Sequence, residues 1–452
     1  MRYHGVMPFR RYGTFTGGID LPDEKHATLG APIRPCPRPE RLGVPLGSWR
    51  GAPAEPTVRP GDRVRAGQRI AAAPDDTGVD VFSPLDGRVG PVGSARVAAG
   101  GGFAHSPAIE LTDLSEPDLP PAAPERVFDW ASAGPEELRQ RLAEGGLLTY
   151  CRSPAPLMRW IAQARERSCR TLLANVIEHE PYVTADHRVL AEHGQEVMEG
   201  LAVLARAIGA GDVALAADRR RTPYYEGSLA AAERLGISRI ALPHKYPIGA
   251  DTILTKVLTR RETPPGESTT AVGAAVVDAA TCLAVCHWVV YGLRPLGRAV
   301  TVAGPRTAEP ANVWAPFGAD CLRLAGDDGG LVLHGGPMAG VPCRPGTVVT
   351  PATQALICLQ TPREPLASPC IRCGWCTDHC PARLNVASLN DAFELSLVAV
   401  ASRAAVAACV ECGVCSYVCP ARLPLTQRVR QLKAKVRAAA AAARSPAGAE
   451  ST

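Results

Sequence analysis

Two runs of four cysteines near the end of the chain share one spacing. The first reads Cys370-Ile-Arg-Cys373-Gly-Trp-Cys376-Thr-Asp-His-Cys380-Pro381, and the second reads Cys409-Val-Glu-Cys412-Gly-Val-Cys415-Ser-Tyr-Val-Cys419-Pro420. A C-x2-C-x2-C-x3-C-P run supplies thiolates to 4Fe–4S clusters, and in two-cluster proteins the fourth cysteine of each run binds the cluster of the other. We therefore expect two clusters with crossed ligands: Cys370, Cys373, Cys376 and Cys419 for cluster 1, and Cys409, Cys412, Cys415 and Cys380 for cluster 2.

Zinc, disulfides and chance are the alternatives to iron–sulfur clusters. Structural zinc sites use two C-x-x-C pairs, and a third cysteine three residues further on is unexpected there. Disulfides need an oxidising compartment, and the N-terminus has no apolar segment that would direct export. Chance is excluded because 16 cysteines in 452 residues would not produce two full copies that both end in proline. The spacing is that of two-cluster ferredoxins.

Length and composition limit the classes of protein to consider. A chain of 452 residues exceeds one ordinary hydrophobic core, so we expect several domains. The apolar share of 46% excludes general disorder. Residues 421–452 carry seven basic side chains against the carboxylate of Glu450, which leaves the rest of the chain close to neutral within the total of +5. No basic patch interleaved with aromatic residues is present, so nucleic acid is not expected as a partner.

The most apolar stretch of the sequence, Ala271 to Val290, contains Asp278 and His287. These polar residues favour a buried strand followed by a helix over a membrane span. We therefore expect a protein without a transmembrane segment in the reducing cytoplasm.

The order of apolar patterns along the chain predicts a multidomain α/β plus β protein. Residues 41–95 alternate short apolar runs with turns, which indicates a β-sandwich. They resemble the halves of a biotinyl/lipoyl-type barrel, but Leu85-Asp86 stands where the carrier lysine would be. Strand and helix patterns alternate over 130–295, with a helix predicted from Val189 to Ile208, and 296–360 returns to strands. Residues 385–408 and 425–443 are predicted to be helical.

Two features of the C-terminal part have two interpretations each. The apolar residues of 425–443 make one stripe, Leu425, Val429, Leu432 and Val436, with basic residues on the other faces. Either this helix packs on the cluster domain, or its basic face meets acidic lipid or an acidic partner.

Trp375 and Tyr417 lie inside the cysteine runs, and we expect them either to shield the clusters from water or only to fill space.

The order of motifs along residues 14–437 resembles the RnfC family of the Rnf electron-transport complex, whose flavin domain is similar to the NADH-binding flavoprotein of respiratory complex I. The eight cysteines match the family in full. Residues 17–25 resemble its GGIHPPExK motif, and residues 178–186 resemble its ECEPYLTAD motif. Residues 245–249, 261–266 and 335–340 resemble its KYPQG, REVPPG and GGPMMG motifs, in that order.

This resemblance implies a domain order. It comprises an N-terminal barrel-sandwich domain at 14–125, an open α/β flavin-type domain at 130–295 and a β-grasp (SLBB) domain at 296–362. A helical ferredoxin domain with two 4Fe–4S clusters at 363–437 and a flexible tail at 438–452 complete it.

One departure from the family concerns the flavin. The family binds FMN and NADH with a GLGGAGFPT loop, whose glycines let backbone N–H groups approach the phosphates. Tyr150, Cys151 and Arg152 stand where that loop has Gly, Ala and Gly, and Asp278 replaces an asparagine. A carboxylate repels a phosphate by about 1 kcal/mol even in water. The resemblance leaves Glu178, Glu180 and Arg152 as cofactor-binding candidates of a degenerate site, and Arg152 gripping a phosphate in a rearranged site remains an alternative.

The function that we expect from these observations is electron transfer. The chain would be the iron–sulfur subunit of an Rnf-type complex, with other members of the complex and a redox protein of the ferredoxin or NADH dehydrogenase type as partners. It would lie peripherally on the inner face of the plasma membrane. The alternatives are an NADH:acceptor flavoenzyme with FMN in an altered pocket, and a scaffold that docks a separate dehydrogenase.

Overall fold

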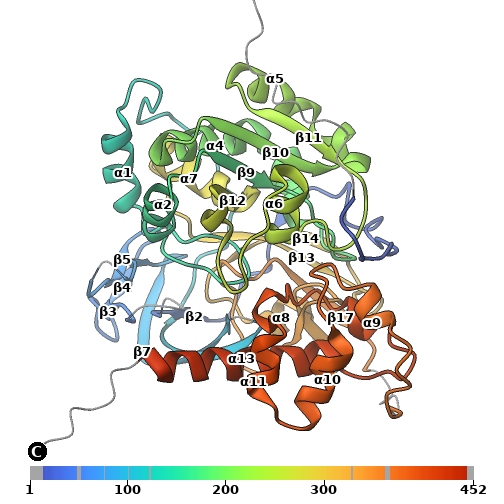
Figure 1. Ribbon diagram of the computed structural model, residues 1–452. Coiled ribbons are helices and arrows are strands. Elements are labelled where there is room, and N and C mark those ends of the chain that lie inside the picture. The colour runs from blue at the N-terminus through green and yellow to red at the C-terminus, as the bar shows by residue number, and fades with distance from the viewer. Residues whose placement is uncertain are drawn as a thin grey trace, which may run out of the picture. The chain divides into compact units, whose positions relative to one another are not determined.

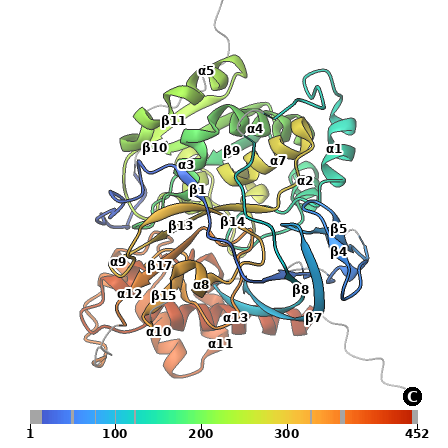
Figure 2. The ribbon, with the colours of Figure 1, turned by 180° about the vertical axis from the view of Figure 1, so that it is seen from behind.

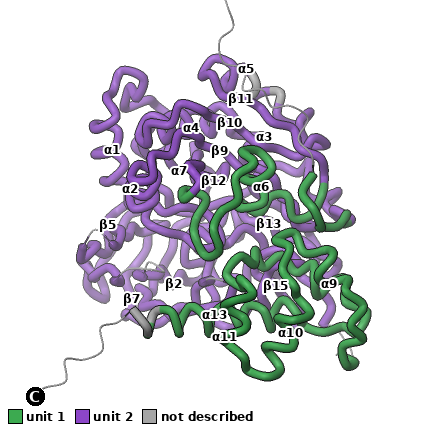
Figure 3. Tube along the Cα trace, in the orientation of Figure 1, with its two compact units in different colours: residues 1–21, 245–271, 362–452 green, residues 22–244, 272–361 purple. Residues whose placement is uncertain are grey.

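The computed structural model describes residues 14–47, 52–75, 77–99, 101–121, 124–326, 329–361 and 367–444 (Figure 1). Contacts within the chain divide it into two compact units (Figure 3). The first combines residues 1–21, 245–271 and 362–452, and the second combines 22–244 and 272–361. The unit that holds the cysteine runs therefore includes two segments that are remote from them in the sequence.

A parallel four-stranded sheet forms the centre of the α/β part of the second unit. Its strand order is β11-β10-β9-β12, and neighbouring strands pair in parallel. The predicted alternation of strands and helices is confirmed over this part. The strands are β9 (Thr171–Asn175), β10 (Asp212–Asp218), β11 (Ser238–Leu242) and β12 (Ala274–Asp278). The helices are α1 (Pro135–Ala143), α2 (Leu157–Glu166), α3 (Ala185–Glu192), α4 (Gly194–Ile208), α5 (Glu226–Arg234) and α7 (Ala279–Tyr291), with the 3-10 helix η1 (Arg219–Tyr225).

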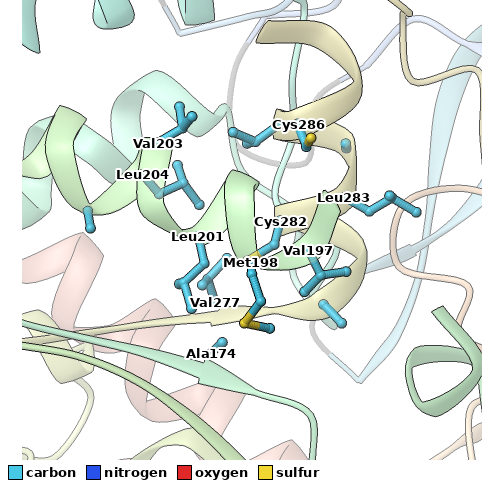
Figure 4. Packing of buried hydrophobic residues seen from close by; sticks show 14 of the residues in the cluster. Ala174, Val197, Met198, Leu201, Val203, Leu204, Val277, Cys282, Leu283 and Cys286 are labelled. Atoms are coloured by element: carbon cyan, nitrogen blue, oxygen red, sulfur yellow. The ribbon is translucent and has the colours of Figure 1, made fainter. Parts of the chain in front are cut away.

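The core of this part lies between the sheet and the helices α4 and α7. Met198 and Leu201 of α4 are fully buried, as is Ala174 of β9, and Figure 4 shows them packed together with residues of α7. Burying one methionine or leucine side chain contributes about 1.5–3 kcal/mol to stability. One expectation was wrong in detail: the helix predicted from Val189 to Ile208 is interrupted, because His193 has φ −119° and ψ 30° and separates α3 from α4.

A mixed six-stranded sheet, in the order β1-β14-β13-β17-β15-β16, follows in the same unit. Five of its strands come from 297–359, and β1 joins it from near the N-terminus by pairing with β14 in parallel (Figure 2). The elements are β1 (Ile33–Pro35), β13 (Gly297–Ala303), β14 (Ala311–Pro316), α8 (Cys321–Ala325), β15 (Leu331–His334), β16 (Val341–Pro342) and β17 (Ala355–Leu359).

The N-terminal part of the second unit is built from β-strands, as expected. A four-stranded sheet has the order β2-β8-β7-β4, and a three-stranded sheet has the order β3-β5-β6. The strands β7 and β8 form a long antiparallel hairpin, which was not expected from the sequence. The strands are β2 (Leu42–Pro45), β3 (Glu55–Pro56), β4 (Arg63–Val64), β5 (Arg69–Ala72), β6 (Val81–Phe82), β7 (Gly87–Ala99) and β8 (Gly102–Thr112).

The first unit is helical, with a small apolar core that includes Leu389, Val406 and Leu432. Its α-helices are α6 (Asp251–Thr259), α9 (Trp375–Asp378), α10 (Val386–Glu394), α11 (Val398–Arg403), α12 (Val414–Tyr417) and α13 (Leu425–Arg444). The 3-10 helix η3 (Val406–Ala408) also belongs to this unit, and the last residue of the 3-10 helix η2 (Thr269–Val272) belongs to the second unit. The last helix continues to Arg444, beyond the tail boundary expected at 438, and 445–452 lie outside the described residues. Among the described helices none is long and apolar enough to span a bilayer.

Candidate functional site

The two cysteine runs have the same backbone conformation. Arg372 and Glu411, which each precede the second cysteine of a run, have φ of 55° and 57°. Gly374 and Gly413 follow that cysteine with φ of 84° and 82°, and each begins a one-turn helix, α9 or α12. L-residues adopt this left-handed region only when the surroundings enforce it. The repeated sequence spacing therefore corresponds to a repeated local structure.

The residues proposed to bind cluster 1 line one cavity. Its walls include all four of the expected thiols, Cys370, Cys373, Cys376 and Cys419, and it encloses about 380 Å³, part of it open to solvent. Burial raises the pKa of the Cys376 thiol, and the neighbouring Cys419 and Cys373 raise it further. Cys419 of the second run therefore lies beside the thiols of the first run. Cys370 and Cys373 are exposed, so this site is open to solvent.

The residues proposed to bind cluster 2 lie deeper in the unit. Burial raises the pKa of the Cys412 thiol, and Cys409, Cys415 and Cys380 raise it further. Cys380 of the first run, which is 9% exposed, therefore lies beside the thiols of the second run. Two groups of four soft sulfur atoms are the donor set that iron–sulfur clusters require, so the residues fit two 4Fe–4S clusters.

Backbone N–H groups and a hydroxyl lie within hydrogen-bond distance of the sulfur atoms of the second group. The backbone N–H of Leu384 donates to Cys380 Sγ at 3.4 Å, and that of Glu411 donates to Cys409 Sγ at 3.3 Å. The Thr426 hydroxyl lies 3.5 Å from Cys415 Sγ. Hydrogen bonds to sulfur and solvent exposure both tune cluster potentials. The two sites therefore differ in solvent exposure, since Cys370 and Cys373 are exposed. Hydrogen bonds to sulfur occur at both sites, because Thr377 hydrogen-bonds to Cys376 of the first set.

The helix α13 packs on the cluster domain through its apolar stripe. Leu425, Val429 and Leu432 are 2% exposed or less. Lys433, 8% exposed, donates to the carbonyl of Cys409 at 2.6 Å and pairs with Glu411 at 3.0 Å. Arg430 pairs with the other oxygen of Glu411 at 3.2 Å. Arg430 and Lys433 therefore pack within the unit, whereas Lys435 and Arg437 of the same helix are exposed.

Trp375 and Tyr417, which we expected either to shield the clusters or to fill space, are largely exposed. Trp375 is 53% exposed and Tyr417 is 59% exposed, and Ile371, inside the first run, is 67% exposed. Trp375 and Tyr417 stand on the surface because the one-turn helices that carry them, α9 and α12, lie at the outside of the unit's small core, and Ile371 lies in the loop before α9. They add apolar area to the surface around the first cysteine group.

Two remote segments contact the second run and the end of the first, a contact that sequence reasoning missed. Tyr246 is fully buried, and its hydroxyl donates to the carbonyl of Cys412 at 2.6 Å. Ile19 and Tyr246 exchange two backbone hydrogen bonds, and the N–H of Gly18 donates to the carbonyl of His379. A Cβ at Gly17 would lie 2.8 Å from the carbonyl oxygen of Cys380, so only glycine fits there. The segments around 17–19 and 245–249 therefore support the cysteine runs.

Replacing Tyr246 by phenylalanine is expected to destabilise the protein by about 1–2 kcal/mol, because the carbonyl of Cys412 loses the donor that the fully buried Tyr246 provides. Chemical denaturation of the cluster-loaded protein measures this free energy. Tyr417→Phe is the matched control, since Tyr417 is exposed. An equal effect of both substitutions would contradict a specific role of the Tyr246 hydroxyl.

The loop that corresponds to the family's flavin cradle is filled by its own side chains. Tyr150 is 6% exposed, and its backbone N–H donates to Thr281 Oγ1 at 2.8 Å. The Asp278 carboxylate caps α7 by accepting from the N–H of Thr281 at 2.7 Å. Arg298 donates to the carbonyl of Tyr150 at 3.3 Å. The groups of Tyr150 and Asp278 that would have to face a flavin phosphate are thus hydrogen-bonded to other groups of the protein.

The side chains of the three cofactor-binding candidates, Arg152, Glu178 and Glu180, are also hydrogen-bonded within the chain. Arg152 donates to the carbonyl of Ala339 at 3.1 Å. Glu180 accepts from the N–H of Met338 at 2.9 Å. Glu178 accepts from the backbone N–H groups of Asp186 and His187 and from the Gln354 amide. The residues present do not fit a bound FMN, and Arg152 is directed to a carbonyl of the chain.

Three parts of the chain match known protein families. Family models match the RnfC barrel sandwich hybrid domain at residues 13–113, the Nuo51 FMN-binding domain at 154–287 and a 4Fe-4S dicluster domain at 366–420. The C subunit of the ion-translocating oxidoreductase complex of Rhodobacter capsulatus is 32% identical over 403 residues, which cover 86% of this chain and 76% of the relative. The C subunit of the proton-translocating ferredoxin:NAD(+) oxidoreductase complex of Clostridium ljungdahlii is 28% identical over 391 residues, 83% of this chain and 84% of the relative.

Among solved structures, an NAD+-reducing NiFe-hydrogenase in the H2-reduced state aligns with a TM-score of 0.48 and 18% identity, over 70% of this chain and 67% of the hydrogenase chain. A likeness at this level carries no argument about the function of the present chain.

Proposed function

The chain belongs to the RnfC family of Rnf-type ion-translocating oxidoreductase complexes, and from this premise we propose that it relays single electrons through two 4Fe–4S clusters. The observation that carries the proposal is the grouping of eight cysteines into two sets of four within one compact unit. Each cluster, when bound, would accept and release one electron. We assign Cys370, Cys373, Cys376 and Cys419 to cluster 1, and Cys409, Cys412, Cys415 and Cys380 to cluster 2.

The different exposure of the two sites suggests how the chain exchanges electrons with a partner. Cys370 and Cys373 are exposed, whereas Cys380 is buried. Ile371, Trp375 and Tyr417 expose apolar surface around the first site, and aromatic residues are enriched at protein interfaces. We propose that a redox protein of the ferredoxin or NADH dehydrogenase type docks at cluster 1, and that the buried site is protected from direct exchange with solvent.

The α/β part supports a proposal about the flavin. Because Tyr150 fills the loop and Asp278 places a carboxylate at the start of α7, we infer that this region holds no FMN and does not oxidise NADH. Its role would then be structural, as a folded domain inherited from flavin-binding relatives. Electrons would reach the cysteine sites from another protein.

An anaerobic redox titration tests this function. The purified, cluster-loaded chain is expected to take up about two electrons per chain from dithionite, one per cluster, and none from NADH. A bound flavin would add its own two-electron uptake and would be bleached by NADH. Reduction by NADH, or flavin released in stoichiometric amount on denaturation, would contradict the proposal for the α/β part without affecting the cluster assignment.

The division of the chain into domains can also be proposed from its order of elements. We propose domains at 14–125, 130–295, 296–362 and 363–437. We propose that the segment 296–362 is a β-grasp (SLBB) domain; the parallel pairing of β13 with β17 at the centre of the sheet and the position of α8 between β14 and β15 support this proposal. We further propose that the other members of an Rnf-type complex hold the chain at the inner face of the plasma membrane.

A further inference from the structure

Two histidines and a glutamate converge where α4 begins beside α7. His193 lies at the junction of α3 and α4, Glu196 lies in the first turn of α4, and His287 lies in α7. One nitrogen or carboxylate oxygen from each of the three lies within 4.8 Å of the others. None of these residues belongs to the cysteine runs or to the degenerate flavin loop.

The close approach of the two helices brings these side chains together. A Cβ at Gly200 would lie 1.8 Å from the carbonyl oxygen of Cys282, so the backbone of α4 touches that of α7 at this point. Figure 4 shows Val197 and Leu201 of α4 packed among Cys282 and Leu283 of α7. Because buried apolar contacts hold both helices, the positions of the three polar residues are set by the rigid core and not by a surface loop.

His287 is a buried side chain with an unsatisfied nitrogen. It is 6% exposed, and within the described part of the chain its Nε2 atom has no hydrogen-bond partner. Leaving such an atom unsatisfied costs about 1–3 kcal/mol. Burial lowers the pKa of His287 to about 4, so the ring is neutral near neutral pH and Nε2 can offer a lone pair. A ligand that accepts this lone pair would remove the cost.

His193 and Glu196 complete the donor set on the solvent side. His193 Nδ1 lies 2.6 Å from Glu196 Oε2, and the two side chains are 19% and 13% exposed. The rings of His193 and His287 are nearly perpendicular, with their centroids 6.1 Å apart. The nearby carboxylate of Glu199 is engaged by Arg126 at 2.9 Å and does not compete for the same position. The group is therefore accessible to an ion from solvent on one side and backed by the core on the other.

We propose that His193, Glu196 and His287 bind a divalent transition-metal ion, with zinc as the best match. Two imidazoles and one carboxylate form a common three-residue zinc set that leaves a fourth position for water. Calcium and magnesium prefer oxygen ligands, so the two imidazoles disfavour them. The ion would tie the α3–α4 junction to α7 and would satisfy the buried nitrogen of His287.

Metal analysis of the cluster-loaded chain tests the proposal. After incubation with zinc sulfate and dialysis, the wild-type chain is expected to retain one zinc per chain in addition to its iron. X-ray absorption at the zinc edge should show nitrogen and oxygen neighbours at about 2.0–2.1 Å. Zinc that had entered the cysteine sites would instead show sulfur at about 2.3 Å, and that result would overturn the proposal, as would a failure to retain zinc.

Two variants and a control make the assignment specific. Glu196→Gln and His193→Ala are expected to weaken zinc binding by about 100-fold or more, since losing a ligand costs at least as much as losing a supporting partner. His105→Ala is the control, because His105 is exposed and belongs to the N-terminal β part. Zinc should raise the melting temperature of the wild type and of the control but not of the two variants. Unchanged zinc affinity in both variants would exclude this site.

Discussion

Replacing Cys380 by serine is expected to abolish cluster 2 while leaving cluster 1 in place, although Cys380 belongs to the first cysteine run. Its thiol lies beside Cys412 and Cys415. The reciprocal change, Cys419→Ser, is expected to abolish cluster 1, because Cys419 lines the cavity of the first set. Each variant should keep about half of the iron, since each cluster uses four thiolates. Iron analysis and EPR spectra of the reduced variants measure this outcome.

The control for these variants is Cys151→Ser, since Cys151 is a thiol of the α/β part that lies outside both runs. It should leave both clusters in place. The spectra can be assigned by comparison with Cys373→Ser, which belongs to cluster 1 in any arrangement. If Cys380→Ser and Cys373→Ser lose the same EPR signal, then each run binds its own cluster and the crossed assignment is wrong.

Replacing Lys433 by methionine is expected to destabilise the cluster-loaded protein by about 3 kcal/mol, the lower end of the cost of breaking a buried ion pair. Lys433 is 8% exposed and holds both the carbonyl of Cys409 and the carboxylate of Glu411. The lower end applies because Arg430 still pairs with Glu411 in the variant. The reduction potential of cluster 2 should also fall, since a positive charge near a cluster favours its reduced state.

Chemical denaturation and a potentiometric EPR titration measure these two effects. Lys435→Met is the matched control, because Lys435 is exposed on the same helix and the substitution removes the same charge. A destabilisation of the same size in both variants would show that the helix responds to its charge in general. The specific contact of Lys433 with the second run would then be without energetic importance.

The cluster residues and the order of structural elements could be predicted because their signals are local. The cysteine spacing is contained within two short segments, and the stripe of Leu425, Val429 and Leu432 follows the helical period. The strand β12 and the helix α7 were anticipated from one apolar stretch interrupted by Asp278. In each case, the pattern and the structure that it predicts lie in the same stretch of chain.

The remaining features depend on contacts between distant segments, which one sequence does not reveal. The hydroxyl of Tyr246 reaches Cys412 across the fold, and no periodicity links these positions. The exposure of Trp375 depends on how little core surrounds the short helix α9. The helix break at His193 was missed because the apolar pattern continues through it, and the meeting of His193 with His287 requires the packing of α4 on α7.

Iron and acid-labile sulfide analysis of the purified chain, combined with EPR of its dithionite-reduced form, tests the central claim most directly. The proposed function predicts about eight iron and eight sulfide per chain, and two reduced 4Fe–4S clusters whose signals broaden each other. A chain that binds about four iron, or that binds zinc in place of iron at the cysteine runs, would contradict it.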